Sequence, residues 1–258
     1  MTDLHWDTSI TKLTPTEIRV RGYSIGDLMR KLTFAQAVWL VLMGEIPDEK
    51  LSTLLDAILV ATVDHSAAPP STIAARNVAA TGASLNTAVA SGIMCMNKFH
   101  GGATEGCFKA LNEAVTFARS DNLTFDAAAD AVITIYKQQK KPVPGFGHLL
   151  HTSDPRTTGL FAIAGELGLA GDHIKMANVF AAHFKKAGKN LPININGAVG
   201  AVLGDIGVPP EMMNGFFMIS RVPGLVAHAL EEQKLGIPLR KIHPTDYGYS
   251  GPADRELE

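Results

Sequence analysis

The sequence contains very little cysteine, and its charges nearly cancel. Only Cys95 and Cys107 occur among 258 residues, and they form neither a CxxC pair nor a disulfide framework. We therefore expect two reduced, partly buried thiols in a protein of the cytoplasm. The formal net charge is −2, so no basic field favours binding to nucleic acid or to an anionic membrane.

Long apolar runs and short cofactor signatures are also missing. No apolar run reaches the roughly 18 residues that span a bilayer, and the first residues show no signal-peptide pattern. We find no P-loop and no redox-cofactor fingerprint, so we expect no tightly bound cofactor. No internal repeat or obvious linker divides the chain, which we interpret as a single unit over residues 1–258.

Strand-like alternation is absent as well, and aromatic residues make up only 7% of the chain. Helical periodicity and capping signals occur instead, such as Thr33 with Gln36 at capping-box spacing, Asp154 before Pro155, and Asp172 as an N-cap. We predict an all-α protein. The expected helices cover residues 33–44, 48–62, 71–82, 83–99, 124–140, 154–167, 171–189, 211–220 and 224–236.

Three histidines stand in contexts that favour function. His65 lies in a proline-containing loop of small residues, and His100 and His148 adjoin glycines in FHGGATEG and GFGH. Glycine allows backbone or ligand to come close, and a neutral imidazole can donate a hydrogen bond or move a proton. Four other histidines are expected to be structural, namely His5, His151, His173 and His183.

Three basic residues could supply positive partners for an anionic ligand. Arg156, Arg221 and Lys241 can pair with carboxylates, and arginine does so best through its planar fork. Gly-rich loops at helix starts expose N–H groups that favour anions. We infer a cleft between helices that binds a small polyanionic acid. The alternative interpretation is a zinc site formed by His65, His100 and His148, but the spacing of these histidines matches no short metal motif.

Four segments together resemble the citrate synthase superfamily along nearly the whole chain. They are RVRGYSIGDLMRKLTFAQAVWLVLMGEIP at 19–47, FHGGATEG at 99–106, GFGHLLHTSDPR at 145–156 and SRVPGLVAHALEEQ at 220–233. The resemblance implies a multi-helix fold with a large helical domain and a smaller helical subdomain. The active site would lie in the cleft between them.

The resemblance also implies roles for single residues. His100 would donate a hydrogen bond to a thioester oxygen, and His148 would contact the hydroxyl or ketone of the small acid. The substrate-binding residues would be His65, Arg156 and Arg221. A coenzyme A ester, as substrate or product, would contact Gly145, Phe146 and Gly147.

The chain departs from ordinary citrate synthases in three ways. It is short, as are the compact citryl-CoA lyases and the lyase module of ATP citrate lyase. His243 precedes Pro244 where synthases commonly carry arginine, which makes His243 a further substrate-binding candidate. Most importantly, NINGAVG at 194–200 resembles a family motif whose third residue is the catalytic aspartate, and Asn196 stands there instead.

The asparagine bears directly on catalysis. Cleavage of citryl-CoA by a retro-aldol step leaves an enolate whose carbon must be protonated, and an amide has no proton to exchange. Loss of general acid catalysis lowers a rate by roughly 10²–10⁴-fold. An engineered change, another proton donor or water, and binding without turnover all stay open. Asp205 lies on the opposite helix face and is a poor substitute. A further interpretation is that Asn196 serves only as a helix N-cap.

Our leading hypothesis is a citryl-CoA lyase-like enzyme that forms acetyl-CoA and oxaloacetate or a related 2-oxo acid, with Asn196 as a third catalytic-site position. The rivals are a condensing synthase and a non-catalytic CoA-ester binding protein. We also expect a homodimer or higher homo-oligomer, because residues 71–94 are rich in small side chains that let helices approach closely. The same residues also suit packing inside one subunit. The segment 243–258 has little apolar content and is expected to reach a neighbouring subunit.

Overall fold

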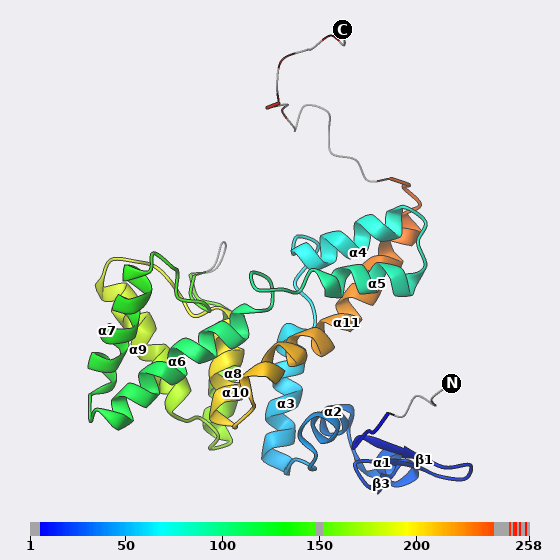
Figure 1. Ribbon diagram of the computed structural model, residues 1–258, viewed down its shortest axis with the longest axis horizontal. Helices are drawn as coiled ribbons and strands as arrows, with labels where there is room; N and C mark the ends of the chain where they lie inside the picture. The colour runs from blue at the N-terminus through cyan, green and yellow to red at the C-terminus, as the bar shows by residue number, and fades with distance from the viewer. Residues whose placement is uncertain are drawn as a thin grey trace.

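The computed structural model describes residues 6–147 and 152–239, together with residues 248, 250, 251, 253 and 256 (Figure 1). Eleven helices and one small sheet form within these residues, which confirms the predicted all-α class. The helices are α1 (Ile25–Lys31), α2 (Phe34–Met43), α3 (Glu49–Thr62), α4 (Pro70–Ala80), α5 (Leu85–Met94), α6 (Ala103–Ser120), α7 (Phe125–Gln138), α8 (Pro155–Glu166), α9 (Asp172–Lys186), α10 (Ile195–Asp205) and α11 (Pro210–Leu235). Among the described helices, none combines the length and the apolar character needed to cross a bilayer.

The buried apolar residues form one large cluster and two small ones. Helices α2, α3 and α6–α10 share the large core with the first half of α11, around residues such as Leu111, Phe180 and Phe216. Helices α4 and α5 pack on the second half of α11, around Ala75 and Ala229. Figure 1 shows the α4–α5 pair at one end and α6, α7 and α9 at the other, with α11 running between them. A large and a smaller helical unit are therefore joined through α11.

Helix α11 corrects a prediction, because it is one helix of 26 residues rather than two. Pro223 lies inside it and removes one backbone hydrogen bond, which costs about 3 kcal/mol in a helix interior. The helix continues because both sides of the proline are anchored: Phe216 and Phe217 are buried before it, and Leu225 and Ala229 are buried after it. Packing thus outweighs the local signal.

A three-stranded antiparallel sheet near the N-terminus is not predicted by the sequence. Its strands are β1 (Thr11–Leu13), β2 (Ile18–Val20) and β3 (Tyr23–Ser24), in the order β1-β2-β3. Such short strands are too brief to show alternation. Arg21 and Gly22 both take positive φ values, 48° and 87°, and form the tight turn between β2 and β3.

Local capping signals are mostly confirmed. Thr33 and Gln36 form both hydrogen bonds of a capping box, and Asp154 caps α8 ahead of Pro155. The predicted cap of α9 is wrong, since Gly171 is the N-cap residue and Asp172 is the first helical residue. Helices α1, α6 and α10 are not among the ranges predicted from the sequence, and α5 ends at Met94 rather than near residue 99.

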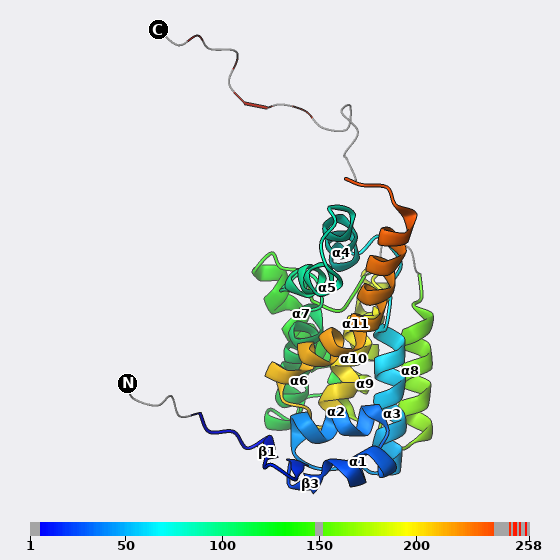
Figure 2. The ribbon, with the colours of Figure 1, turned by 90° about the vertical axis from the view of Figure 1, so that its right-hand side faces the viewer.

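Two helices bring distant parts of the chain to the same place. Helix α3 packs against α8, and Figure 2 shows the two side by side. The segment that follows α3 carries His65, and the first turn of α8 carries Arg156. Since these two side chains are in contact, α3 and α8 run in opposite directions and present them at a common end.

Candidate active site

Arg156 is held in place by the residue that caps its own helix. The Asp154 carboxylate accepts hydrogen bonds from the Arg156 backbone N–H (3.0 Å), from Nε (3.0 Å) and from Nη2 (2.7 Å). Such a bidentate pair fixes the plane of the guanidinium. The remaining nitrogen, Nη1, lies 3.3 Å from Nδ1 of His65. His65 and Arg156, two of the residues expected to bind substrate, are thus in contact.

Arg221 is almost completely buried, with 2% of its surface exposed. Its Nε donates to the Thr62 carbonyl oxygen at 3.0 Å, and its guanidinium lies 4.8 Å from the centre of the Phe217 ring. Burial lowers the pKa of Arg221; the Asp64 carboxylate opposes this effect, while the charge of Arg156 adds to it. Nη1 of Arg221 has no hydrogen-bond partner among the described residues. A buried cation with an unused donor favours an anion beside it.

An arginine on a helix can pair with acidic residues further along it, but Arg221 does not pair with those near the end of α11. Glu231 and Glu232 bind Arg76 instead, at 2.8 and 2.7 Å. Arg221 faces the end of α3.

His100 lies in a tight turn between α5 and α6. Its Nε2 is 2.8 Å from Oγ of Ser71, in the first turn of α4, and its ring meets Phe217 edge-on at 5.9 Å. Gly101 has a φ of +86°, and an added Cβ would lie 2.8 Å from the Phe217 ring, so this position requires glycine. Burial lowers the pKa of His100, and the nearby charges of Arg221 and His65 lower it further. His100 is therefore neutral near pH 7.

Asn196 lies in the first turn of α10, close to the His100 turn. The Thr104 hydroxyl, in the first turn of α6, donates to Asn196 Oδ1 at 3.2 Å. The N-cap of α10 is Asn194, whose Oδ1 accepts from the Gly197 N–H at 3.2 Å. The interpretation of Asn196 as a helix N-cap is therefore wrong. Its side chain is half-buried and faces α6.

The loop of Gly145, Phe146 and Gly147 is clamped to the start of α10. Asn194 N–H donates to the Gly145 carbonyl at 3.0 Å, and Asn194 Nδ2 donates to the Gly147 carbonyl at 2.9 Å. Phe146 stacks on Phe180 (5.8 Å between ring centres) and meets Phe184 edge-on (5.1 Å). The Phe146 ring is therefore committed to the core, and this loop offers a ligand mainly its backbone.

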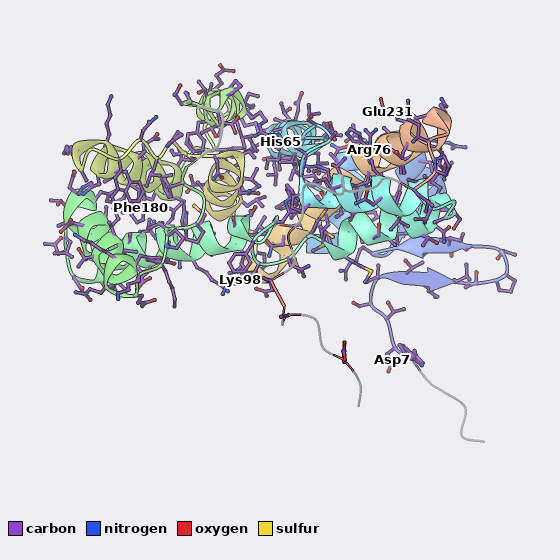
Figure 3. The ribbon with its side chains drawn as sticks, turned by 90° about the horizontal axis from the view of Figure 1, so that it is seen from above. Asp7, His65, Arg76, Lys98, Phe180 and Glu231 are labelled. Atoms are coloured by element: carbon purple, nitrogen blue, oxygen red, sulfur yellow. The ribbon has the colours of Figure 1, made fainter. Side chains whose placement is uncertain are left out.

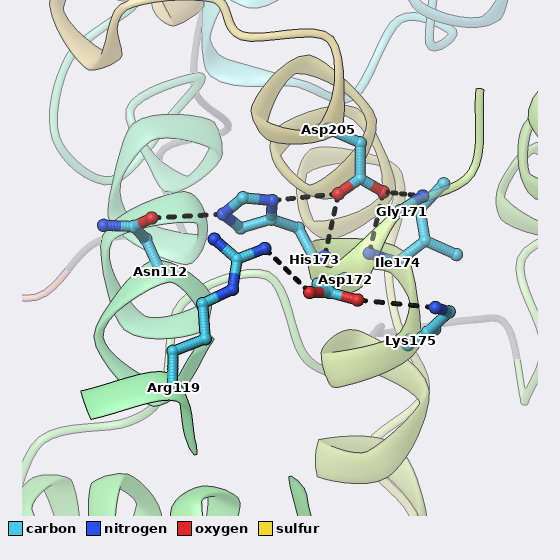
Figure 4. A network of polar contacts seen from close by, with 8 residues as sticks. All are labelled: Asn112, Arg119, Gly171, Asp172, His173, Ile174, Lys175 and Asp205. Carbon is cyan, nitrogen blue, oxygen red and sulfur yellow. Dashed lines mark hydrogen bonds and ion pairs between the residues drawn. The ribbon is translucent and has the colours of Figure 1, made fainter. Parts of the chain in front are cut away.

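Two predicted site residues, His148 and His243, lie outside the described residues, as do Lys241, His5 and His151. Two histidines expected to be structural are described, His173 and His183, and each contacts a neighbouring polar side chain; Figure 4 shows the contacts of His173. His173 bridges Asp205 (2.9 Å) and Asn112 (3.2 Å), and His183 lies 3.2 Å from Asp126.

Asp205 was weighed from sequence as a substitute acid, and the geometry assigns it to a structural task. Its carboxylate accepts the backbone N–H groups of Gly171, His173 and Ile174 at 2.7–3.1 Å and so caps α9 (Figure 4). It faces α9 and not the His100 turn.

Sequence reasoning missed Ser71, Thr104 and the second role of Asp154. Their polar contacts join residues 29, 92 and 2 positions apart in the chain. Only the Asp154–Arg156 pair has a local signal, since a carboxylate at an N-cap two residues before an arginine can serve both the helix and the side chain.

Comparison with known proteins places this site in a family. The family model described as citrate synthase, C-terminal domain, matches residues 44–244. The structure of citryl-CoA lyase from Hydrogenobacter thermophilus is 40% identical, covering 98% of this chain and 97% of that chain with a TM-score of 0.87. ATP citrate lyase from Methanosaeta concilii, in complex with (3S)-citryl-CoA, shares the fold at 20% identity and a TM-score of 0.83, over 98% of this chain and 43% of that one.

Curated relatives show the same relationship. Citrate synthase from Haloferax volcanii is 30% identical over 196 residues, which are 74% of this chain and 49% of that protein. The chain spans about half the length of the curated relatives that it matches. With the family model covering most of the sequence, the chain belongs to the citrate synthase family.

Proposed function

We propose that this protein cleaves citryl-CoA, or a closely related 3-hydroxy-3-carboxyacyl-CoA, to acetyl-CoA and oxaloacetate or the corresponding 2-oxo acid. The observation that carries the proposal is the buried Arg221 guanidinium, whose Nη1 has no partner among the described residues. The similarity to a citryl-CoA lyase over nearly the full length of both chains supports the same activity.

The two arginines would bind carboxylates of the substrate. The charge of Arg156 lowers the pKa of Arg221, and an anion bound by both guanidinium groups would offset this repulsion. His65, in contact with Arg156, would donate a further hydrogen bond to the same small acid. Citryl groups carry several carboxylates, which suits a site with two guanidinium groups.

His100 would stabilise the thioester part of the substrate. When the Ser71 hydroxyl donates to His100 Nε2, the single proton of the neutral imidazole resides on Nδ1. That N–H is then the donor for the thioester oxygen, on which negative charge develops as the enolate forms. The lowered pKa keeps His100 in this neutral form.

The bond-breaking step that we propose rests on the family resemblance. His148, assigned by family resemblance, would remove the proton of the tertiary hydroxyl. The hydroxyl carbon becomes the ketone of oxaloacetate, the C–C bond breaks, and its electron pair becomes the acetyl-CoA enolate. The enolate carbon then takes up one proton. Asn196 can hydrogen-bond near this carbon but cannot supply that proton, so we propose slow turnover with intact binding.

Direct assays distinguish the candidate activities. Citryl-CoA is added to the purified chain, and oxaloacetate is followed with malate dehydrogenase and NADH. Oxaloacetate formation supports the lyase. Free thiol released from acetyl-CoA and oxaloacetate would support the synthase, which the names of the curated relatives favour. Calorimetric binding of coenzyme A without either reaction would support a non-catalytic role, which Asn196 favours.

We propose further that residues 1–258 act as one unit and that the protein forms a homodimer. The small residues of α4 and α5 pack within the subunit, since Ala75, Ala79, Ala88 and Gly92 are buried there. The dimer proposal therefore rests on other surfaces of the chain.

A further inference from the structure

One face of α11 makes polar contacts with the segment that carries His65. Arg221, Gly224 and His228 are three and four residues apart, so they share this face, which we name the α11 seat. Arg221 Nε donates to the Thr62 carbonyl at 3.0 Å. His228 Nε2 lies 3.1 Å from Asp64 Oδ1. The seat therefore contacts the chain on both sides of residue 63.

Gly224 shows how close this contact is. A Cβ at this position would lie 2.6 Å from the Val63 carbonyl oxygen and 2.8 Å from Asp64 Oδ1. Only glycine lets the segment approach the helix in this way. The segment after α3 thus rests directly on the α11 backbone, and its position depends on what holds Asp64 there.

Asp64 connects this contact with the backbone on both sides of His65. While Oδ1 faces His228, Oδ2 accepts the Ser66 N–H at 3.0 Å, and the His65 backbone N–H also donates to this carboxylate. The carboxylate therefore fixes the backbone on both sides of the His65 side chain. That side chain, in turn, contacts Arg156 at 3.3 Å.

The second ring nitrogen of His228, Nδ1, also contacts a side chain. Arg76, on α4, places Nη1 3.5 Å from His228 Nδ1, and the same guanidinium binds Glu231 (2.8 Å) and the fully buried Glu232 (2.7 Å). Figure 3 labels Arg76 and Glu231 beside each other, and His65 nearer the middle of the molecule. Since a guanidinium only donates, Nδ1 of His228 accepts and Nε2 carries the proton that Asp64 receives.

We propose that His228 is a positioning residue for the small-acid half of the site. It acts through Asp64, which orients residues 62–66 so that His65 meets Arg156. The expected effect on oxaloacetate binding rests on the proposed function. The hydrogen bonds that hold residues 62–66 are present in the protein without ligand and do not depend on that function.

The test compares three variants of the full chain. His228→Leu removes the hydrogen bond to Asp64, and His228→Gln keeps a side-chain N–H that can reach it. His183→Leu is the matched control, because His183 also contacts an aspartate (Asp126, 3.2 Å) but lies on α9, away from the seat. Amide hydrogen exchange of Ser66 reports the hold on the segment, and calorimetry reports binding of oxaloacetate and of coenzyme A.

We expect His228→Leu to speed Ser66 exchange and to weaken oxaloacetate binding about tenfold, which corresponds to about 1.4 kcal/mol. Coenzyme A binding should stay within about twofold, because that half of the ligand is held elsewhere. His228→Gln should restore most of the oxaloacetate affinity, and His183→Leu should change neither quantity.

Two results would overturn the proposal: unchanged Ser66 exchange in His228→Leu, or faster exchange with unchanged oxaloacetate affinity. Should His228→Leu fail to fold, His228→Phe removes the same hydrogen bond and leaves the Asp64 acceptor of the Ser66 N–H in place, and the same two measurements decide. A wild-type protein that binds neither oxaloacetate nor coenzyme A would contradict the proposed function. The hold of His228 on the segment would then be judged by Ser66 exchange alone.

Discussion

At the scale of single residues, Asn196 sets the rate that we expect for this protein. Replacing it by aspartate supplies an exchangeable proton beside Thr104 and should raise kcat for citryl-CoA cleavage by roughly 10²–10⁴-fold. Affinity for oxaloacetate should change much less, because the amide and the acid have similar size. Steady-state assays of both proteins measure the difference.

Asn86→Asp is the control for this prediction. It adds the same carboxyl group in the exposed first turn of α5, where Asn86 Oδ1 accepts from the Ser84 hydroxyl and an aspartate can accept in the same way, so kcat should stay unchanged. Fast turnover of the unaltered chain, unaffected by Asn196→Asp, would show that the proton comes from another group.

His100 supplies a second prediction at this scale. Burial, Arg221 and His65 hold its pKa below the ordinary 6.5, so its ¹³C-labelled imidazole should titrate below pH 6.5 in NMR. Below pH 6.5 the unfolded chain binds this proton more readily than the folded one, and His100 therefore makes the protein less stable as the pH falls.

Arg221→Met tests the cause of this shift. It removes a positive charge near His100 and should move the titration toward 6.5. Arg76→Met removes a charge that is bound to Glu231 and Glu232 and should not move it. An unshifted titration in Arg221→Met would contradict the electrostatic account.

At the scale of elements, the junction of the 145–147 loop with α10 is the tightest backbone contact near the site. Gly145 has a φ of +84°, and an added Cβ would lie 2.5 Å from Cys107 Sγ and 2.7 Å from Gly197 Cα. Gly145→Ala should therefore lower the free energy of unfolding by about 2 kcal/mol or more, from backbone strain and overpacking together. Urea denaturation measures the loss.

Gly188→Ala separates the two causes. Gly188 also has a positive φ, +72°, but no atom lies within 4 Å of an added Cβ. This variant should lose only the strain contribution, about 1 kcal/mol. Equal losses in the two variants would mean that the contact with Cys107 and Gly197 contributes nothing.

At the scale of the whole molecule, we propose that exposed apolar side chains at and after the end of α5 belong to the homodimer surface. Phe99 is 92% exposed beside the His100 turn, and Met94 at the end of α5 is 77% exposed. Exposed apolar surface of this kind is typical of interfaces. We expect sedimentation at micromolar concentration to give twice the chain mass of 27.5 kDa.

Phe99→Ser with Met94→Ser should shift this equilibrium toward the monomer. Ile73→Ser, with Ile73 46% exposed on α4, is a control for loss of apolar surface in general. A wild-type monomer at micromolar concentration would rule the homodimer out.

The sequence by itself determined the helical class, most helix starts and the family motifs. These are local properties: the capping box of Thr33 and Gln36, and the Asp154-Pro155 start of α8, each need only neighbouring residues. Arg156 and His100 became candidates in the same way, because their glycines and caps lie within a few positions.

Only the tertiary structure decided which side chains meet. His65 reaches Arg156 across 91 positions, and Asp64 reaches His228 across 164. Periodicity carries no information on such pairs, since helix packing alone brings them together. The same holds for α11, where core packing on both sides overrides Pro223, and for Asp205, which caps a helix that begins 33 residues before it. Local chemistry identified the candidate residues, and long-range packing determined the neighbours of those that the structure describes.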